Sequence, residues 1–439
     1  MPGHKRNINM AVDSGSFGDA ISSMYSIDIT EIDGFDNLHD AKDLIQDAQN
    51  RAAKLYKSDE THFLVNGATC GILAAVAAVS EKGKRIIVAR NCHNSVYNAI
   101  EINNLTPVYV YPDMLSDCGI GSEIAGSIRK EEIEKAVIAN PDACGILITS
   151  PTYDGVLSDI AGIAKIAHEY DIPLIVDEAH GALFFMEGRS AVIGAADIVI
   201  NSVHKTLPAL TQTALLHVNG NLVDRKKLRK YLSVYQTSSP SYVLMASIDY
   251  AVELMEEKGK SLYREFCLRT YRLKEELNKL RNIKYISKDT LINQGAFDFD
   301  ESKVLIAAIN EKINGKKLYS ILRDTYKLQP EMAAGDYVLL MTTLFDSDEG
   351  INRLIEALFE IDCNIESYAI NKEAENCSEN EIETEYNEIL NNIGKNSPYT
   401  VFAYPPGIPI IVKNERVTEE AVSEIRNAKD KNLDIKWIG

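Results

Sequence analysis

The chain has 439 residues, of which 45% are hydrophobic and 25% are charged, and its formal net charge is −18. This length is enough for a large buried core and about two domains, and the proportions are those of a globular protein. The acidic balance argues against a nucleic-acid partner, which would require a basic surface. No apolar run is long enough to cross a membrane and no secretory signal opens the chain, so we expect no membrane partner.

The seven cysteines are scattered and show no CxxC spacing: Cys70, Cys92, Cys118, Cys144, Cys267, Cys363 and Cys377. An odd number of dispersed cysteines is typical of reduced thiols rather than of a disulfide framework or a zinc site. The pattern therefore predicts a cytoplasmic protein without a structural metal.

Residues 1–36 are rich in Gly, Asp, Ser and Asn without sustained periodicity, and we expect them to form an N-terminal arm. From there on, apolar runs alternate with amphipathic stretches. The runs with strand character are 62–65, 85–89, 107–111, 145–149, 174–176, 198–201 and 214–218. The helical patterns are 41–56, 72–79, 96–103, 130–139 and 160–170. Strands separated by helices predict an α/β fold with a mostly parallel seven-stranded sheet and helices on both faces.

A long amphipathic stretch over 250–280 predicts a helix that bridges to a second domain. Shorter elements follow at 303–309, 315–325, 337–343 and 349–361. A capping-box pattern at Ser378 and Glu381 predicts an acidic surface helix over 379–393, closed by Gly394. We therefore expect an arm over 1–36, a large domain over 37–255, and a smaller α+β C-terminal domain over 256–439 that includes most of the bridging helix.

Two successive strand runs end in side chains that suit pyridoxal phosphate (PLP). Asp177 follows the run at 174–176, and Lys205 follows the buried run at 198–201. Burying an ammonium group costs free energy unless its charge is paired or lost. A lysine at the end of a buried strand therefore suggests a functional role. A PLP enzyme needs a lysine for a Schiff base and an acid for the pyridine nitrogen. Ligands of such sheets lie beyond the carboxyl ends of the strands, where both residues fall.

Residues 66–71 (Asn-Gly-Ala-Thr-Cys-Gly) join a strand run to a helical run, which is a pattern that binds phosphate at a helix N-terminus. Four further polar residues also follow strand runs: Thr69, His93, Thr152 and Tyr153. Each of these candidate residues also fits an ordinary structural role. Lys205 can extend its side chain to water, Asp177 can cap a helix, and the other residues can lie in turns. The acids Asp28, Glu31 and Asp33 suit a cationic substrate or a solvated loop.

Seven motifs along nearly the whole chain resemble those of the bacterial ornithine/lysine/arginine decarboxylase family of fold-type-I PLP enzymes. They are PGHK (2–5), DITEIDGFDNLH (28–39), NGAT (66–69), SPTYDG (150–155), DEAHG (177–181), SVHK (202–205) and YPPGIP (404–409). The size resembles the short branch without an N-terminal wing domain, which is similar to arginine decarboxylase. The chain starts within the family's N-terminal motif, and we expect a shortened arm.

The resemblance implies roles for individual residues. Lys205 would form the Schiff base, Asp177 would pair with the pyridine nitrogen, and His93 would stack on the ring. Ala179 would pack under the ring with His180 close to it. Four residues would bind the phosphate: Ala68, Thr69, Ser202 and His204.

The resemblance also implies a homodimer or a higher even oligomer with shared active sites. Thr237 and Ser238 would reach the phosphate of the neighbouring subunit. Two positions depart from the family pattern: Leu183 stands where the family has His, and Ala68 stands where it often has Ser. The first departure puts any local polar role at position 183 in doubt, and the second removes one possible hydroxyl from the phosphate site.

We therefore expect PLP-dependent decarboxylation of a basic amino acid, with arginine first and then lysine or ornithine, to CO₂ and the amine of the polyamine pathway. Two alternatives remain open at this point because one fold supports many reactions. The first is an aminotransferase or a β-eliminating lyase, and transamination would need an arginine such as Arg323 or Arg353 to hold the substrate's α-carboxylate. A PLP-binding regulatory protein would keep the cofactor without turnover.

Overall fold

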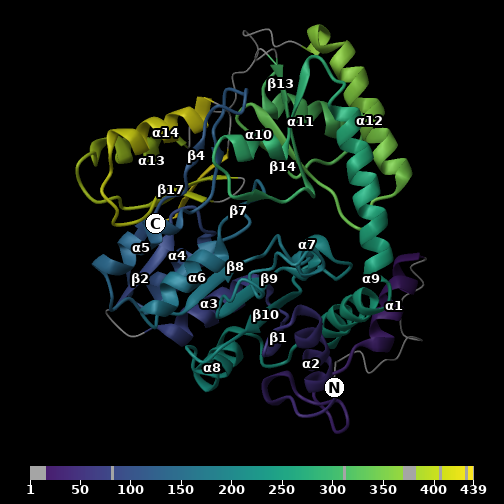
Figure 1. Ribbon diagram of the computed structural model, residues 1–439, viewed down its shortest axis with the longest axis vertical. Coiled ribbons are helices and arrows are strands. Elements are labelled where there is room, and N and C mark those ends of the chain that lie inside the picture. Colours follow the sequence, from purple (N-terminus) through teal and green to yellow (C-terminus); the bar gives the residue numbers. More distant parts are fainter. Residues whose placement is uncertain are drawn as a thin grey trace.

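The computed structural model describes residues 16–80, 84–309, 313–368, 382–404, 408–430 and 434–438. It contains a seven-stranded sheet in the lower half of Figure 1, a four-stranded sheet above it, and a three-stranded sheet at the C-terminal end, beside both. The expected motif at residues 2–5 and the first part of the expected arm lie outside the described residues.

The seven-stranded sheet has the order β1-β10-β9-β8-β6-β2-β3. Its strands are β1 (Glu60–Leu64), β2 (Arg85–Ala89), β3 (Thr106–Val110), β6 (Ile146–Thr149), β8 (Leu174–Asp177), β9 (Ile198–Asn201) and β10 (Ala214–Val218). Among these described strands, β10 alone runs in the direction opposite to the other six. The prediction of a mostly parallel seven-stranded sheet in an α/β fold is confirmed.

Helices cover both faces of this sheet. Along β10, Ala214 and Leu216 pack in one buried cluster and Leu215 packs in another, as alternating side chains on a two-sided strand must. The first cluster includes α3 (Gly67–Val79) and α4 (Asn94–Ile102), and the second includes α2 (Leu44–Tyr56). The remaining helices of this part are α5 (Lys130–Ala139), α6 (Ile160–Glu169), α7 (Val203–Thr206) and α8 (Arg225–Tyr235). Burial on both faces explains why the strands read as unbroken apolar runs.

The helix α9 (Tyr242–Leu277) spans 36 residues and runs along the right-hand side of Figure 1 towards the upper half. It begins earlier than its periodicity indicates because the Ser241 hydroxyl accepts a hydrogen bond from the Leu244 amide and caps the N-terminus. The boundary that we expect between residues 255 and 256 falls inside this helix.

The upper sheet has the order β11-β13-β15-β14, and its neighbours run antiparallel. Its strands are β11 (Ile283–Ile286), β13 (Lys303–Ala308), β14 (Met332–Ala334) and β15 (Tyr337–Met341). The helices around it are α10 (Lys288–Asn293), α11 (Gly315–Asp324) and α12 (Asp348–Cys363). A short strand pair, β7 (Val156–Leu157) with β12 (Asp298–Phe299), joins the lower half to this upper half.

Several elements were not expected from the sequence. Helix α1 (Ser16–Ile27) lies in the expected arm, and β4 (Met114–Leu115) pairs with β5 (Ile124–Ala125). The C-terminal sheet has the order β17-β16-β18, from β16 (Thr400–Tyr404), β17 (Ile408–Ile411) and β18 (Asp434–Ile438). Helix α14 (Glu419–Asp430) packs against it. The expected acidic helix is present as α13 (Ile382–Asn391), and residues 369–381 lie outside the described part.

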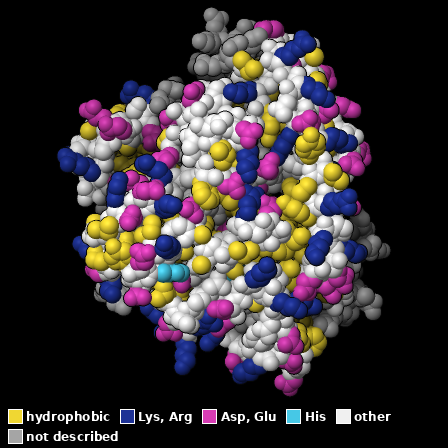
Figure 2. Space-filling view, in the orientation of Figure 1, with side chains coloured by type: hydrophobic (Ala, Val, Ile, Leu, Met, Phe, Trp, Pro, Cys, Tyr) yellow, Lys and Arg dark blue, Asp and Glu magenta, His cyan; other side chains and the backbone are white. Residues whose placement is uncertain are grey.

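Three short 3₁₀ helices complete the described elements: η2 (Leu38–Asp40), η3 (Phe184–Met186) and η5 (Ile365–Tyr368). Within the described ranges, none of the helices combines the length and the apolar character that a membrane crossing needs. Figure 2 shows acidic and basic side chains intermingled over the visible face.

Candidate active site

A cavity of about 240 Å³ opens beyond the carboxyl ends of the parallel strands. Nine of the eleven residues that we singled out for the site line it: Ala68, Thr69, His93, Asp177, Ala179, His180, Ser202, His204 and Lys205. They come together because β2, β6, β8 and β9 are neighbours that point the same way, so their ends meet at one edge. Thr149 and Asp177, for example, stand opposite each other in the ladder between β6 and β8.

Lys205 reaches the cavity from α7, the single helical turn after β9. Its Nζ lies 3.0 Å from Nε2 of His180. Burial lowers the pKa of Lys205 below that of an ordinary lysine, although the carboxylates of Asp177 and Glu331 act in the opposite direction. A lower pKa leaves more of the amine neutral, which is the form that attacks a carbonyl group.

Asp177 ends β8 and is only 3% exposed. Burial raises the pKa of its carboxyl group, and the nearby His93 and Lys205 oppose this rise. The amide of Ala179 donates to Asp177 Oδ1 over 3.1 Å and holds the carboxylate in place. A buried carboxylate with its second oxygen open to a cavity suits a cationic partner.

His93 is held at the N-terminus of α4. Its Nδ1 accepts a hydrogen bond from the Ser95 amide at 3.2 Å and lies 2.8 Å from the Ser95 hydroxyl. A ring nitrogen that accepts carries no proton, so the proton of the neutral ring is on Nε2. Burial lowers the pKa of His93, which keeps the ring neutral at neutral pH. A neutral, fixed imidazole is suited to stack on an aromatic ligand.

Helix α3 presents an open N-terminus to the cavity. Its N-cap residue Asn66 makes no capping hydrogen bond with its side chain, and the first amides of a helix have no partner inside the helix. Gly67 has a φ of +74°, a conformation that residues with a Cβ rarely adopt, and it turns the chain into the helix. The amides of Ala68 and Thr69 are thereby available to an anion in the cavity.

Sequence reasoning missed several residues of the cavity. Asn91 lines it, and its buried Oδ1 has no hydrogen-bond partner among the described residues. Ile408 of β17 covers it from the C-terminal sheet. The motif over 404–409 indicated a role for this segment, of which residues 405–407 lie outside the described part. Lys303 is buried, and its Nζ lies 2.8 Å from Nδ1 of His180, which lines the cavity.

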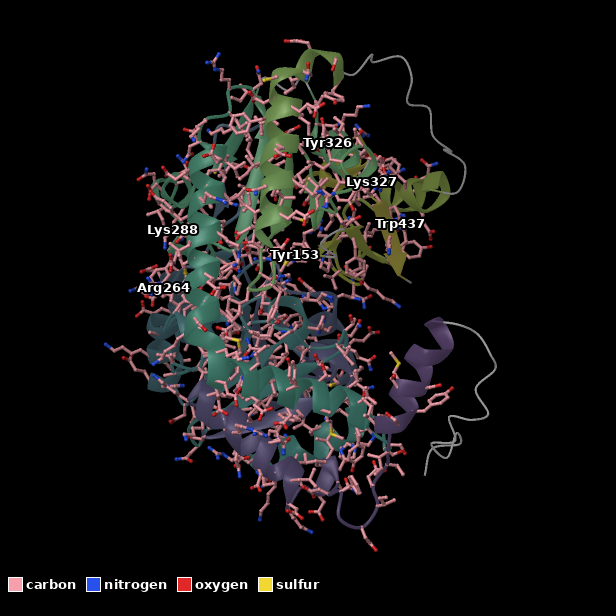
Figure 3. The ribbon with its side chains drawn as sticks, turned by 90° about the vertical axis from the view of Figure 1, so that its right-hand side faces the viewer. Tyr153, Arg264, Lys288, Tyr326, Lys327 and Trp437 are labelled. Atoms are coloured by element: carbon pink, nitrogen blue, oxygen red, sulfur yellow. The ribbon has the colours of Figure 1, made fainter. Side chains whose placement is uncertain are left out.

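Tyr153, labelled in Figure 3, lines the cavity near the level where the lower and upper halves meet. Its ring packs edge-on against His180 with 4.9 Å between the ring centroids. The neighbouring Thr152 has the ordinary role of a turn residue, since its hydroxyl accepts a hydrogen bond from the Val156 amide at 3.1 Å.

The structure does not bring Thr237 and Ser238 into the cavity of their own chain, and both are exposed. The Thr237 amide lies 3.4 Å from Oδ1 of Asn66, and the Thr237 carbonyl accepts a hydrogen bond from His39 at 2.8 Å. This segment therefore lies beside the open N-terminus of α3. Leu183, at the position where the family has His, is buried in the cluster around α2 and α9.

The acids Asp28, Glu31 and Asp33 are not among the residues that line the cavity. The arginines considered for a substrate carboxylate are also elsewhere. Arg323 is exposed on α11 and pairs with Asp324, and Arg353 is exposed on α12, where it donates to the carbonyl of Tyr326.

The residues of the cavity fit PLP. Lys205 offers an amine to an aldehyde, and Asp177 offers a carboxylate to a pyridinium nitrogen. The neutral His93 ring can cover one face of the cofactor ring, and the amides at the start of α3 can bind a phosphate. The Asn91 oxygen shows that the cavity wall holds a buried polar atom with no partner among the residues that the structure describes.

A family model described as "Orn/Lys/Arg decarboxylase, major domain" matches residues 1–316. The arginine decarboxylase of Bacillus subtilis is 31% identical to the chain over 452 residues, which cover 99% of this chain and 91% of that protein. The constitutive lysine decarboxylase of Escherichia coli is 24% identical over 60% of this chain and 38% of its own length.

Two solved structures share the fold. The crystal structure of the Francisella novicida lysine decarboxylase matches with a TM-score of 0.82 and 19% identity, over 100% of this chain and 76% of that one. The serine palmitoyltransferase of Sphingomonas wittichii matches with a TM-score of 0.60 and 14% identity, over 83% of this chain and 86% of that one.

Proposed function

We propose that this chain, which belongs to the Orn/Lys/Arg decarboxylase family, removes the α-carboxylate of arginine with PLP as its cofactor. The observation that carries the proposal is the cavity in which the amine of Lys205, the carboxylate of Asp177 and the imidazole of His93 meet at the strand ends. Arginine comes first because the arginine decarboxylase of Bacillus subtilis aligns with nearly the whole chain.

Each of these residues has a distinct part in holding the cofactor. Lys205 would hold PLP covalently through Nζ, and Asp177 would accept the N–H of the pyridinium ring. His93 would stack on the ring, and Ala68, Thr69, Ser202 and His204 would hold the phosphate. When bound, PLP supplies an electron sink for the electron pair of the breaking bond between Cα and the carboxylate. Asp177 supports this sink because a buried carboxylate keeps the pyridine nitrogen protonated.

The chain's own residues also control water and protons. Ile408 covers the cavity with an apolar side chain and limits the access of water. His180 Nε2 lies 3.0 Å from Nζ of Lys205, so this imidazole would hold the free amine by a hydrogen bond inside the cavity. Both effects keep the reaction at Cα away from bulk solvent.

Glu331 is the residue that we propose for the basic end of the substrate. It is exposed at the start of β14, and its Oε1 accepts a hydrogen bond from the Tyr153 hydroxyl at 2.6 Å. Tyr153 lines the cavity, and the charge of Glu331 is close enough to raise the pKa of both Lys205 and Lys303. A carboxylate next to a residue of the cavity wall suits a guanidinium group, which binds carboxylates in a bidentate way.

We further propose a homodimer in which Thr237 and Ser238 of one subunit approach the phosphate site of the other. Support comes from their exposure and from the position of Thr237 next to Asn66, at the start of α3. Five of the described cysteines are free thiols, which supports a cytoplasmic location: Cys70, Cys92, Cys118, Cys267 and Cys363. Transamination is disfavoured because Arg323 and Arg353 do not line the cavity.

The test is to incubate the purified chain and PLP with arginine, lysine and ornithine one at a time. We expect CO₂ and agmatine from arginine, identified by mass spectrometry, at a higher rate than the amines of the other two. A keto acid instead of an amine would show an aminotransferase. Bound PLP without any product would show a regulatory protein.

A further inference from the structure

Glu178 carries a fully buried carboxyl group directly after Asp177, and the proposed function does not use it. Its side chain is 1% exposed, and the residue is not among those that line the cavity. Glutamates are almost never fully buried unless the carboxyl group is paired. The partners of Glu178 therefore show what this group does so close to the proposed site.

The carboxylate of Glu178 accepts hydrogen bonds from two other segments of the chain. The amide of Ala191 donates to Oε1 over 2.6 Å, and the Ser190 hydroxyl donates to Oε2 over 2.9 Å. Nδ2 of Asn201 donates to Oε2 over 3.0 Å and to the carbonyl oxygen of Glu178 over 2.9 Å. Ser190 and Ala191 follow η3 in the chain, and Asn201 is the last residue of β9. The side chain of Glu178 thus joins the end of β8 to the end of β9 and to the segment after η3.

Two neighbouring residues are adapted to this arrangement. Nδ2 of Asn201 gives both of its hydrogen bonds to Glu178, while the buried Oδ1 has no partner among the described residues. The orientation of the Asn201 amide is therefore determined by Glu178. Gly181, the last residue of the motif over 177–181, leaves space for the carboxylate stem, because a Cβ there would lie 2.6 Å from Cγ of Glu178.

This bridge connects the two strand ends that carry the proposed cofactor residues. The parallel ladder between β8 and β9 ends with the pair of Asp177 and Ile200, and the amide of Glu178 donates to the Ile200 carbonyl over 2.9 Å. Beyond this point the side chains of Glu178 and Asn201 continue the connection. Asp177 precedes the bridge on one strand, and Lys205 follows it on the other, in α7. The bridge therefore fixes how far apart the two strand ends stand at the cavity.

We propose that Glu178 is a positioning residue: together with Asn201 it sets the separation of Asp177 from Lys205, so that both reach PLP at once. The pyridine ring is rigid, and its nitrogen lies opposite the carbon that carries the aldehyde group. Lys205 has a flexible stem and can follow a displaced aldehyde, whereas the short side chain of Asp177 cannot follow a displaced nitrogen. A shifted strand end would first break the hydrogen bond between Asp177 and the ring nitrogen. This inference rests on the proposed roles of Asp177 and Lys205.

The experiment measures the protonation of the ring nitrogen in the full chain with PLP bound. ¹⁵N NMR of PLP labelled at this nitrogen distinguishes the protonated form from the unprotonated form. Burial raises the pKa of Glu178 to about 7, so a pH above this value keeps the wild-type carboxylate charged. Glu178→Gln keeps the shape of the side chain, but in either orientation of its amide an N–H group faces the amide of Ala191 or Nδ2 of Asn201.

We expect a protonated ring nitrogen in the wild type and a largely unprotonated one in Glu178→Gln. PLP should remain attached to Lys205, which borohydride trapping and mass spectrometry of the peptide would show. The kcat for arginine should fall about ten-fold with little change in KM, because a small misplacement of Asp177 affects the transition state more than substrate binding. Asn201→Ala removes the bond between the strand ends but keeps the contacts of Glu178 with the segment after η3. It should give the same change in the NMR signal, and it decides the question if Glu178→Gln does not fold.

Asp197→Ala is the matched control, because Asp197 joins the same two strands at their opposite ends. Asp197 is buried and directly precedes β9. Its Oδ2 accepts a hydrogen bond from the amide of Leu174, the first residue of β8, over 2.8 Å and lies 2.9 Å from Nε2 of His168. We expect this variant to lose stability and to keep the protonated ring nitrogen.

A protonated ring nitrogen in folded Glu178→Gln would overturn the inference. An equal loss of protonation in Asp197→Ala would also overturn it, since any loosening of the two strands would then be a sufficient cause. In both cases the wild-type signal still supports the proposed roles of Asp177 and Lys205. A wild-type chain that binds no PLP, or that binds it with an unprotonated ring nitrogen, would overturn those roles and the inference with them.

Discussion

Arg90 and Glu415 are 325 residues apart in the sequence and form an ion pair of 3.0 Å that fastens the C-terminal sheet to the large sheet. Arg90 follows β2, and its guanidinium also donates to the carbonyls of Pro409 at 2.6 Å and Ile410 at 3.1 Å. These carbonyls adjoin Ile408, which covers the cavity. The pair therefore holds β17 over the site.

Glu415→Gln should weaken the attachment of β17, and with it the position of Ile408 over the cavity. Removing one charge from a largely buried, charge-assisted hydrogen bond costs about 1.5–3 kcal/mol, and we expect PLP to dissociate about ten-fold faster. The measurement is the dissociation rate of PLP after dilution. Glu419→Gln is the control, because Glu419 is exposed on α14. Equal dissociation rates in both variants would show that the pair does not hold the cover.

Lys205→Ala should abolish the covalent attachment of PLP. The visible absorbance of the protein-bound cofactor should change to that of free PLP, and the formation of amine should fall below detection, because the attacking amine is gone. Lys226→Ala on the exposed face of α8 is the control. An unchanged visible spectrum in Lys205→Ala would remove Lys205 from its proposed role.

Asp177→Asn should retain PLP but decarboxylate slowly. The amide has nearly the same shape but cannot keep the pyridine nitrogen protonated, so we expect kcat to fall about 100-fold, or about 2.7 kcal/mol in activation free energy. The measurement is kcat with saturating PLP, with the bound cofactor quantified in parallel. Turnover at the wild-type rate would contradict the pairing of Asp177 with the ring.

Glu331→Gln should raise KM for arginine about ten-fold with little change in kcat, since a contact to the distal end of the substrate contributes similarly to the ground state and the transition state. Initial rates over a range of arginine concentrations give both constants. Glu349→Gln, on the exposed first turn of α12, is the control. A fall in kcat at constant KM would place Glu331 in a different role.

The buried Lys303 should make folding stability depend on pH. Its pKa is about 8 in the folded chain and 10.5 in the unfolded chain. Between these values the unfolded chain binds more protons, so the free energy of unfolding rises with pH. The rise is at most about 3.5 kcal/mol, since a pKa difference of one corresponds to about 1.4 kcal/mol.

The measurement is urea unfolding of the wild type and of Lys303→Met over this range of pH. The difference between the two proteins removes the contributions of other groups, and we expect it to change in favour of the wild type as the pH rises. Parallel curves would mean that Lys303 keeps its ordinary pKa in the folded chain.

The alternation of strand and helix patterns was enough to predict the large sheet, because buried parallel strands and amphipathic helices differ in period. The same pattern predicted that Asp177 and Lys205 lie at the edge of the sheet where the parallel strands end. Helix α1 could not be predicted, because Ser, Gly and Asp are weak helix formers and make up much of it. Such helices depend on tertiary contacts that a local pattern does not contain.

Lys303 could not be found from the sequence either. A lysine before an apolar run is the ordinary start of a strand, and the residues that surround Lys303, such as Gly155 and His180, belong to distant segments. Its contact with His180 spans 123 residues. The same holds for Ile408, whose place over the cavity depends on Arg90. Local patterns predict elements and strand ends, whereas contacts between distant segments require the assembled fold.

The position of Ile408 also has a consequence for protein synthesis. A ribosome that has released the chain up to β13 has already produced Lys205, Asp177, His93 and Lys303, but it has not yet produced β17. The wall of the cavity that Ile408 forms is therefore synthesised after every residue to which we assign a contact with the cofactor.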